Sequence, residues 1–244
     1  MPFGDLEAVK RAIGPQTAAI LIEPIMGEGG VRVVAPEFLK ALRELCDQQG
    51  LLLVFDEIQT GMGRTGELFC YQRVGVAPDV MAAAKALGGG FPVGACLATY
   101  EAAKGMTPGS HGSTFGFNPL AMSVANAVLD VMLAPGFFDH VKKAGLLLKQ
   151  RLAEIKDRYP SVIAEVRGEG LLIGLRAVVP AGELVDVLRA EKMVTVAAGD
   201  NVVRLLPPLI VSEQEIAECV ARLDRACAQL SRAYSTQRRQ EVVR

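Results

Sequence analysis

The sequence has few of the side chains that build metal centres or disulfide frameworks. Only two histidines and no tryptophan occur among its 244 residues, so a histidine-based metal site is not expected. The five cysteines are odd in number and form no Cys-x-x-Cys pair, which predicts free thiols in a reducing cytoplasm. A formal net charge of only -1 argues against nucleic acid or an anionic membrane as the main partner.

Long apolar runs are absent as well. None approaches the roughly 20 residues that a membrane-spanning helix requires. The first residues, MPFGDLEAVK, show neither an apolar signal-peptide core nor an Arg-rich presequence. We therefore expect a cytoplasmic protein with no membrane partner. Hydrophobic residues are nevertheless abundant, at 50% of the total, which is enough for a sizeable core in one large domain or two modest ones.

Strand-like and helix-like segments alternate over the first part of the chain. The run LLLVFD shows no polar alternation, as expected for a strand covered on both faces. The segment APEFLKALRELCDQQG predicts an amphipathic helix with Pro36 early and Gly50 at its end. Further strands are expected at TAAILIEP, DVMAAAK and VGACLAT, and a second helix at NPLAMSVANAVLDVML. This order predicts an α/β domain with a mostly parallel sheet over residues 1–134.

The stretch APGFF marks a change of pattern. Beyond it we predict a smaller α+β domain over residues 135–231, with helices at HVKKAGLLLKQRLAEIKDRYP and GELVDVLRAEK and strand-like stretches at EVRGEGLLIGLRA and VVRLLP. Ser212 and Glu215 have the spacing of a capping box, which predicts the start of a last helix. The polar end, residues 232–244, is expected to be a disordered tail.

Two adjacent acids, Asp56 and Glu57, close the apolar run LLLVF. Carboxylates at the end of a buried strand are costly unless a cation meets them. One interpretation is the acidic strand end that holds a metal in P-loop ATPases, but its partner pattern G-x-x-x-x-G-K-[ST] is missing. Another is a dinucleotide site at GMGRTG, but the residues DEIQT separate these glycines from the strand.

Lys85 and a Gly-rich loop supply two further candidates. Lys85 follows the apolar MAAA and precedes a glycine triplet. It is either a strand-end lysine that extends to solvent or an amine that forms a Schiff base, with the glycines admitting a cofactor close to the backbone. In GSHGSTFGFNP, Ser113 and Thr114 precede a predicted helix. Hydroxyl and N–H groups in such a loop suit a phosphate, although ordinary turn residues would also explain it.

These three elements together are more specific than any one of them. Pyridoxal phosphate requires a carboxylate that keeps its ring nitrogen protonated, a lysine that binds its aldehyde, and a phosphate site. Asp56, Lys85 and Thr114 offer these groups in order along the chain. The cation expected beside Asp56 is therefore the pyridinium of the cofactor.

The chain resembles the class III (omega-amino acid) aminotransferases, which are fold type I enzymes that use pyridoxal phosphate. The resemblance runs from about Phe3 to Leu230 and rests on EPIMGEGGV, LVFDEIQTGMGRTG, PDVMAAAKALGGGFPVGA, GSHGSTFGFNPLA and VRGEGLLIGL. It implies an α/β fold with a smaller α+β domain, transamination in two half-reactions, and a homodimer with shared active sites. Within the family, GDNVVRLLPPLIV and GSHGSTFGFNPLA look most like members that act on N-acetylornithine.

The resemblance implies a role for each residue of the cofactor site. Asp56 would pair with the pyridinium nitrogen, and Gln59 would lie near the phenolic oxygen of the ring. Lys85 would be the Schiff-base lysine, which also shuttles a proton. Thr114 would contact the phosphate across the dimer interface, and Ser113 would lie near the substrate.

For the substrate, the resemblance implies a further pair. Arg204, a cation inside an apolar strand, would hold the α-carboxylate. Glu28 would pair with this arginine when an amino donor reacts at its distal amine. Without the resemblance, Arg204 would be interpreted as a strand-edge arginine and Glu28 as a plain loop acid.

The sequence departs from the family pattern in two residues and in length. Met26 stands where glutamine is frequent, and Phe117 where glycine is frequent. Family chains are markedly longer, and their additional N-terminal part normally provides a phosphate loop, an aromatic residue stacked on the cofactor, and an arginine for the far end of the substrate. We therefore expect this chain alone to be poorly active, or an inactive fragment that retains the fold.

The expected reaction of the enzyme is transfer of the distal amine of N-acetylornithine to 2-oxoglutarate, a step of arginine biosynthesis. Ornithine, 4-aminobutyrate and succinyl-ornithine are the alternative donors. The expected partners are thus small molecules and a second copy of the chain.

Overall fold

The computed structural model describes residues 2–242, with side chains described for residues 2–236. The chain divides into two compact units. The first unit consists of Met1–Ile25 and Val34–Phe138, and the second of Met26–Val33 and Asp139–Arg244. The sequence had suggested a single boundary after residue 134. In the structure, the short segment Met26–Val33 belongs to the second unit although the residues on both sides of it belong to the first. No local sequence pattern predicts this assignment.

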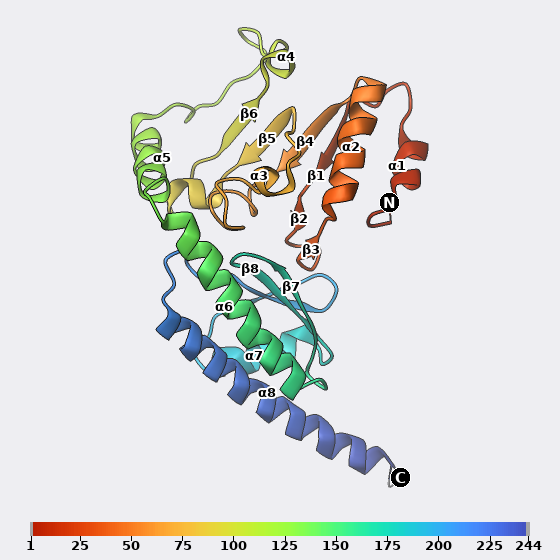
Figure 1. The fold of residues 1–244 in the computed structure, drawn as a ribbon, viewed down its shortest axis with the longest axis vertical. Helices are drawn as coiled ribbons and strands as arrows, with labels where there is room; N and C mark the ends of the chain where they lie inside the picture. The colour runs from red at the N-terminus through yellow and green to blue at the C-terminus, as the bar shows by residue number, and fades with distance from the viewer. Residues whose placement is uncertain (1, 243–244) are drawn as a thin grey trace. The chain divides into compact units, whose positions relative to one another are not determined.

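The first unit is built on a four-stranded sheet in the order β1-β4-β5-β6. Strands β1, β4 and β5 are parallel, and β6 runs antiparallel to β5. The mostly parallel α/β sheet expected from the sequence is thus present (Figure 1). The strands span Ala19–Ile22 (β1), Leu52–Asp56 (β4), Val80–Ala83 (β5) and Ala95–Ala98 (β6).

Helix α2, Pro36–Gln49, covers one face of this sheet (Figure 1). Pro36 lies in its first turn, where a missing N–H costs nothing, and Gly50 ends it in the left-handed conformation. Its buried face, which includes Leu39 and Leu42, packs in the same hydrophobic core as Leu53 and Phe55 of β4. Burial of these side chains is the main stabilising contribution to the first unit.

The opposite face of the same sheet is apolar and, in the described part of the chain, partly exposed. Strand register places Leu21, Val54, Val80 and Ala98 in one row across the four strands. Leu21 is 69% exposed, and β6 is exposed along its whole length. Strands of parallel sheets are normally buried on both faces. Leu21 and β6 therefore lack the cover that strands of such a sheet usually have.

Smaller elements complete the first unit. The 3-10 helix η1 follows β5, and Asn118 caps α5 by accepting a hydrogen bond from the Ala121 N–H. Three short helices had not been expected from the sequence, because they carry little amphipathic pattern. The elements are α1 (Leu6–Ala12), α3 (Cys70–Val74), η1 (Lys85–Gly88), α4 (Tyr100–Ala103) and α5 (Pro119–Met132).

The second unit contains an antiparallel four-stranded sheet in the order β7-β8-β10-β9, together with three helices. The stretch EVRGEGLLIGLRA, expected as one strand-like segment, is a hairpin that turns at Gly170, whose φ is 55°. The strands are Ile163–Glu169 (β7), Leu172–Ala177 (β8), Val196–Ala198 (β9) and Val202–Leu205 (β10), and the helices are Phe137–Arg158 (α6), Ala181–Ala190 (α7) and Glu213–Val242 (α8).

The start of α8 confirms the predicted capping box. The Ser212 hydroxyl accepts from the Glu215 N–H at 3.2 Å, and the Glu215 carboxylate accepts from the Ser212 N–H at 2.8 Å. The helix then continues to Val242, through most of the stretch for which the sequence suggested a disordered tail. Residues 243–244 lie outside the described part of the chain.

A two-stranded ribbon links the units in sequence. It pairs β2, Ile25–Met26, with β3, Arg32–Val33. Strand β3 lies beside β7 of the second unit. The loop between β2 and β3 carries Glu28.

Candidate cofactor and substrate sites

Asp56 and Lys85 lie at the same edge of the parallel sheet. Asp56 is the last residue of β4 and is paired in register with Ala82 of β5. Lys85 is the second residue after the end of β5, with Ala84 between them. The carboxyl ends of adjacent parallel strands are where open α/β sheets place their ligands. The two residues singled out from the sequence are therefore brought to one edge by the strand order.

Asp56 faces the partly exposed side of the sheet. Side chains alternate along a strand, so Asp56 shares its face with Leu52 and Val54. Its Oδ1 accepts a hydrogen bond from the Ile58 N–H at 3.0 Å. Within the described part of the chain, no lysine or arginine forms an ion pair with this carboxylate. A cationic ligand on this face would meet a half-buried acid that is already held in place.

Lys85 has a strained backbone. Its φ is 52°, a left-handed conformation that residues other than glycine rarely adopt. The side chain is exposed and not buried in a strand. Strain of this kind costs on the order of 1–3 kcal/mol and persists where the surrounding structure imposes it, often at functional sites. The conformation turns Lys85 out of the strand direction at the sheet edge.

The glycine triplet after Lys85 has a structural use. Gly88 is buried, and a Cβ placed there would lie 2.8 Å from Val93 Cγ1. Gly89 has a φ of 55°, and a Cβ would lie 2.9 Å from Val128 Cγ2 in α5. These two glycines let η1 pack closely against its neighbours, whereas a Cβ on Gly90 would meet nothing within 4 Å.

Glu57 is a structural acid that the sequence left unexplained. It is fully buried, and its carboxylate accepts from the N–H groups of Cys70 at 2.6 Å and Tyr71 at 2.7 Å. It also accepts from the Thr60 hydroxyl at 3.0 Å. Burial raises the pKa of Glu57, while these hydrogen bonds act in the opposite direction. Glu57 thus satisfies the first N–H groups of α3, and only Asp56 of the acidic pair remains for chemistry.

Replacing Glu57 is expected to destabilise the first unit strongly. Glu57→Ala leaves two buried N–H groups without an acceptor, so we expect a loss of about 3–5 kcal/mol in the free energy of unfolding. Urea denaturation followed by circular dichroism measures it. Glu44→Ala, on the exposed side of α2, is the control and should stay within about 0.5 kcal/mol. Equal stability of the two variants would contradict the capping role.

Gln59 and the GMGRTG stretch lie in turns after β4. Gln59 is half-buried in the turn that follows Asp56. The glycines of GMGRTG form turns and do not open a helix, since α3 begins only at Cys70. A Cβ on Gly61 would lie 2.8 Å from the Glu57 carbonyl oxygen. These glycines therefore permit a compact turn, and the dinucleotide interpretation lacks its required helix.

Ser113 and Thr114 lie on an exposed loop before α5. No hydrogen bond joins either hydroxyl to Asp56 or Lys85 in the part of the chain that the structure describes. The loop also carries Phe115, which is 81% exposed, and Phe117, which is 92% exposed. Within this chain the loop does not complete a site with Asp56 and Lys85. Two large apolar side chains are thus exposed beside the two hydroxyls.

The second unit brings Glu28 and Arg204 together. Arg204 lies in β10 with a side chain only 7% exposed, and its Nη1 is 2.7 Å from Glu28 Oε1. Glu28 comes from the loop between β2 and β3, and its side chain is 69% exposed. A nearly buried guanidinium is thus paired with a largely exposed carboxylate. Removing that acid would expose a fork of donors suited to a carboxylate.

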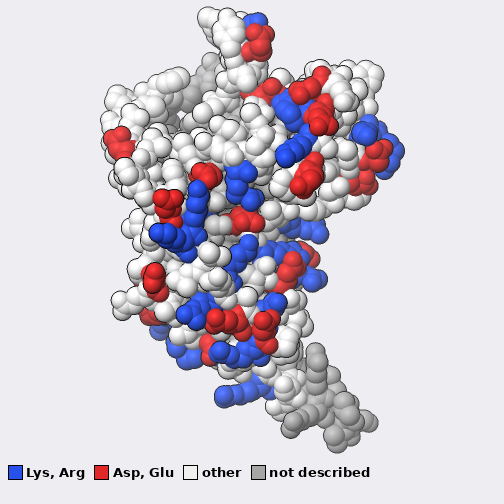
Figure 2. Space-filling view, in the orientation of Figure 1, with Lys and Arg blue, Asp and Glu red and all other residues white. Residues whose placement is uncertain are grey.

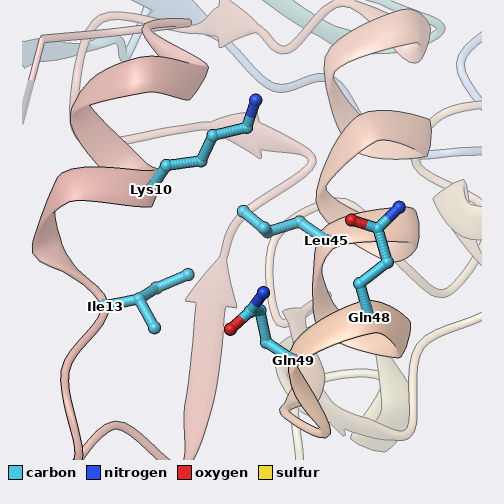
Figure 3. A pocket seen from close by; sticks show the side chains of 5 residues that line it. All are labelled: Lys10, Ile13, Leu45, Gln48 and Gln49. Atoms are coloured by element: carbon cyan, nitrogen blue, oxygen red, sulfur yellow. The ribbon is translucent and has the colours of Figure 1, made fainter.

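A hollow elsewhere in the first unit plays no part in this arrangement. It lies between α1 and α2 and is lined by Lys10, Ile13, Leu45, Gln48 and Gln49 (Figure 3). Gln48 and Gln49 end α2, and the chain enters β4 just beyond them. The hollow is therefore near the start of β4, whereas Asp56 is at its end.

Comparison with protein families matches residues 3–227 to the family described as Aminotransferase class-III. This chain belongs to the class III aminotransferases. As the sequence predicted, the cofactor of this family is pyridoxal phosphate. The chain also resembles named curated relatives and solved structures of the family, over almost its whole length.

Two curated relatives show the extent of the similarity. The chain is 71% identical over 231 residues to acetylornithine aminotransferase 1 of Bradyrhizobium diazoefficiens, covering 95% of this chain and 57% of the relative. It is 60% identical to acetylornithine aminotransferase of Agrobacterium fabrum, covering 95% of this chain and 58% of the relative. The class III chain described here thus spans less than two thirds of the length of these relatives.

Solved structures agree with this assignment. N-acetylornithine aminotransferase from Stenotrophomonas maltophilia matches with a TM-score of 0.86 and 39% identity, covering 96% of this chain and 62% of that one. Ornithine delta-aminotransferase of Plasmodium falciparum matches with a TM-score of 0.89 and 34% identity, with the same coverage. The fold type I architecture expected from the sequence is confirmed for the part of the fold that this aminotransferase chain contains.

The helices were also compared with the length and composition of membrane spans. Among the described residues, no single helix is long and apolar enough to cross a membrane, and α5 and α6 meet the criterion only as a bent pair.

Proposed function

We propose that the enzyme transfers the distal amine of N-acetylornithine to 2-oxoglutarate with pyridoxal phosphate as its cofactor. The observation that carries the proposal is the placement of Asp56 and the strained Lys85 at one edge of the sheet. The chain's 71% identity to an acetylornithine aminotransferase supports the donor. Similarity to ornithine aminotransferases keeps ornithine as the second candidate donor; 4-aminobutyrate and succinyl-ornithine rest on the sequence resemblance alone.

Pyridoxal phosphate, when bound, supplies a protonated ring that takes up the electron pair left when a substrate C–H bond breaks. The Asp56 carboxylate would accept a hydrogen bond from the ring N–H and keep that proton in place. Gln59, in the turn beyond Asp56, would lie beside the phenolic oxygen. The Lys85 amine would hold the cofactor covalently between turnovers and carry the proton of the substrate carbon that bears the reacting amine. Thr114 would bind the phosphate and Ser113 would contact the substrate.

Arg204 would recognise the α-carboxylate of glutamate or 2-oxoglutarate by bidentate hydrogen bonding. N-acetylornithine reacts at its distal amine, so its α-carboxylate lies away from the reacting carbon. Arg204 would then stay ion-paired with Glu28. The 2.7 Å ion pair supports this arrangement. Glu28, being largely exposed, would turn away when a carboxylate takes its place. One site would in this way accept two differently charged substrates.

Substitutions of this pair are expected to affect the half-reactions in opposite ways. Glu28→Ala should slow the half-reaction with the omega-amine and favour glutamate, because the Arg204 charge is no longer masked. Arg204→Ala should impair glutamate and 2-oxoglutarate most, because their carboxylate loses its partner. Single-turnover kinetics of each half-reaction separate chemistry from binding. Equal effects of both substitutions on both half-reactions would contradict the switch.

The proposed activity is tested by comparing two proteins. One is the 244-residue chain, and the other is a chimera in which the N-terminal part of the Bradyrhizobium relative precedes Phe3. We expect the chimera to convert N-acetylornithine and 2-oxoglutarate, and the shorter chain to show at most about 1% of its turnover. Misplacement of a reacting group by about 1 Å can cost about a hundredfold, and the partly exposed face bearing Asp56 leaves the cofactor without an opposing wall. A chimera that accepts ornithine or 4-aminobutyrate but not N-acetylornithine would favour the alternative donors, and a chimera with no activity would favour the inactive fragment.

A homodimer with shared active sites is part of the proposal. Exposed Phe115 and Phe117 beside Thr114 support a protein partner at this loop, and we assign that place to a second copy of the enzyme. On the face drawn in Figure 2, basic and acidic side chains are interspersed, which together with the small net charge gives no support to nucleic acid as a partner. Five free cysteines support a reducing, cytoplasmic location.

A further inference from the structure

We propose that Arg167, ion-paired with Asp200, is a positioning residue that holds the loop carrying Glu28 so that this acid covers Arg204. The inference rests on the proposed function of the Glu28–Arg204 pair. It gives a role to the stretch VRGEGLLIGL, to which neither cofactor binding nor substrate binding assigns one. Arg167 lies in β7, and all four residues belong to the second unit.

Arg167 connects three separate segments of that unit. Its Nη1 lies 2.6 Å from Asp200 Oδ2 and 3.3 Å from the carbonyl oxygen of Gly30. Its Nε lies 2.8 Å from Glu165 Oε2. The side chain is only 16% exposed, and its hydrogen bond to Asp200 lowers the pKa of that carboxyl. A planar fork with several donors can satisfy these acceptors together, which a lysine cannot do.

The loop is attached to the β9–β10 hairpin at two further points. The Gly199 N–H donates to the Glu28 carbonyl oxygen at 2.8 Å. Gly30 has a φ of 99°, and a Cβ placed there would lie 2.7 Å from the Gly199 carbonyl oxygen. Val31 is fully buried and packs against Gly174. A Cβ placed on Gly174 would lie 2.8 Å from the Cβ of Val31. Only an arrangement without side chains at Gly30 and Gly174 allows the backbone to lie this close.

These attachments fix the main chain of the loop while the Glu28 side chain stays exposed. Exchange of Glu28 for a substrate carboxylate is therefore a rotation of one side chain and not a movement of the loop. Arg167 contributes through the Gly30 carbonyl and through Asp200, which lies next to Gly199 in the hairpin. Without Arg167, the Gly30 carbonyl and Asp200 each lose the hydrogen bond that Arg167 donates, while Asp200 keeps Arg176 at 3.8 Å. Glu28 should then cover Arg204 for a smaller fraction of the time.

Arg176 provides a matched control. It is a second arginine near Asp200, at 3.8 Å, in the neighbouring strand β8, and its side chain is 45% exposed. In the described part of the chain it forms no hydrogen bond with the loop. Arg176→Ala thus removes one charge from the same cluster and leaves the attachment of the loop intact. Arg167→Lys is the conservative variant, which keeps the charge and loses the fork.

The test measures how accessible Arg204 is in the folded 244-residue chain. Phenylglyoxal reacts with arginine guanidinium groups, and peptide mass spectrometry gives the rate at Arg204 and, as an internal reference, at the exposed Arg158. Glu28→Ala and Arg167→Ala should each raise the Arg204 rate about tenfold, a change equivalent to about 1.4 kcal/mol. Arg167→Lys should give an intermediate rate, and Arg176→Ala should leave the rate unchanged.

A double substitution distinguishes positioning from general loosening. If Arg167 acts through Glu28, Arg167→Ala should add nothing in a Glu28→Ala background. An equal increase in both backgrounds, or no increase from Arg167→Ala alone, would overturn the inference while leaving the proposed function in place. No increase from Glu28→Ala would contradict the proposed function and the inference with it. Should Arg167→Ala fail to fold by circular dichroism, Asp200→Asn breaks the same ion pair with unchanged shape and should follow the same pattern.

Discussion

Replacing Lys85 by alanine is expected to abolish covalent attachment of pyridoxal phosphate to the enzyme. The amine of Lys85 is the group that binds the cofactor's aldehyde in the proposed site, and Lys85 follows β5 at the sheet edge where β4 ends with Asp56. Borohydride reduces the double bond between a lysine nitrogen and the cofactor carbon and so makes the link permanent. Peptide mapping of the reduced chimera should find the label on Lys85 alone, and Lys85→Ala should carry none.

Lys104→Ala is the matched control for this experiment. Lys104 is an exposed lysine of the same unit and pairs with Glu101 at 2.5 Å. Its substitution should leave the label on Lys85 at full yield. Reduced cofactor on Lys104, or a full yield of label in Lys85→Ala, would show that Lys85 is not the lysine that binds the cofactor.

Removing the charge of Asp56 is expected to have the second largest effect. Asp56→Asn keeps the shape of the side chain and its place at the end of β4, but an amide does not hold the ring nitrogen protonated. We expect turnover of the chimera to fall roughly a hundredfold or more, which corresponds to about 3 kcal/mol of activation free energy. Steady-state kinetics with N-acetylornithine and 2-oxoglutarate measure the loss, and cofactor binding by absorbance shows whether affinity falls as well.

Asp47→Asn tests whether any loss of an acid in the first unit has this effect. Asp47 lies on α2, and its side chain is 64% exposed in an ion pair with Arg43. Because an exposed pair contributes little, turnover should stay within about twofold. Near-normal turnover of Asp56→Asn would mean that the ring nitrogen is held by another group.

The part of the fold that depends on local pattern could be predicted from the sequence. Apolar runs without alternation predicted β4 and β5, and Pro36 with Gly50 predicted the bounds of α2. The candidate residues Asp56 and Lys85 stood out because each interrupts an apolar stretch with a charge. They were grouped because pyridoxal phosphate requires both an acid and a lysine; the shared sheet edge appeared in the structure.

The rest depends on contacts between residues far apart in the chain. Nothing near Glu57 in the sequence shows that it caps a helix starting at Cys70, although a buried acid beside Asp56 was the available signal. The hairpin at Gly170 was missed because the same stretch is apolar on both sides of its turn. The pairing of Glu28 with Arg204 was implied by family resemblance, whereas the transfer of Met26–Val33 to the second unit, which places the two residues together, appeared only in the structure.

That transfer has a consequence for how the protein is made. A ribosome adds about 5–20 residues per second, so Glu28 is synthesised roughly 9 to 35 seconds before Arg204. During this interval the segment Val34–Phe138 is synthesised and can fold with the residues before Met26 as the first unit. The strands of the second unit that contact Met26–Val33 do not yet exist. Contacts so distant in sequence form slowly. The carboxylate switch should therefore be among the last parts of the nascent chain to assemble, after the sheet that carries Lys85 is already in place.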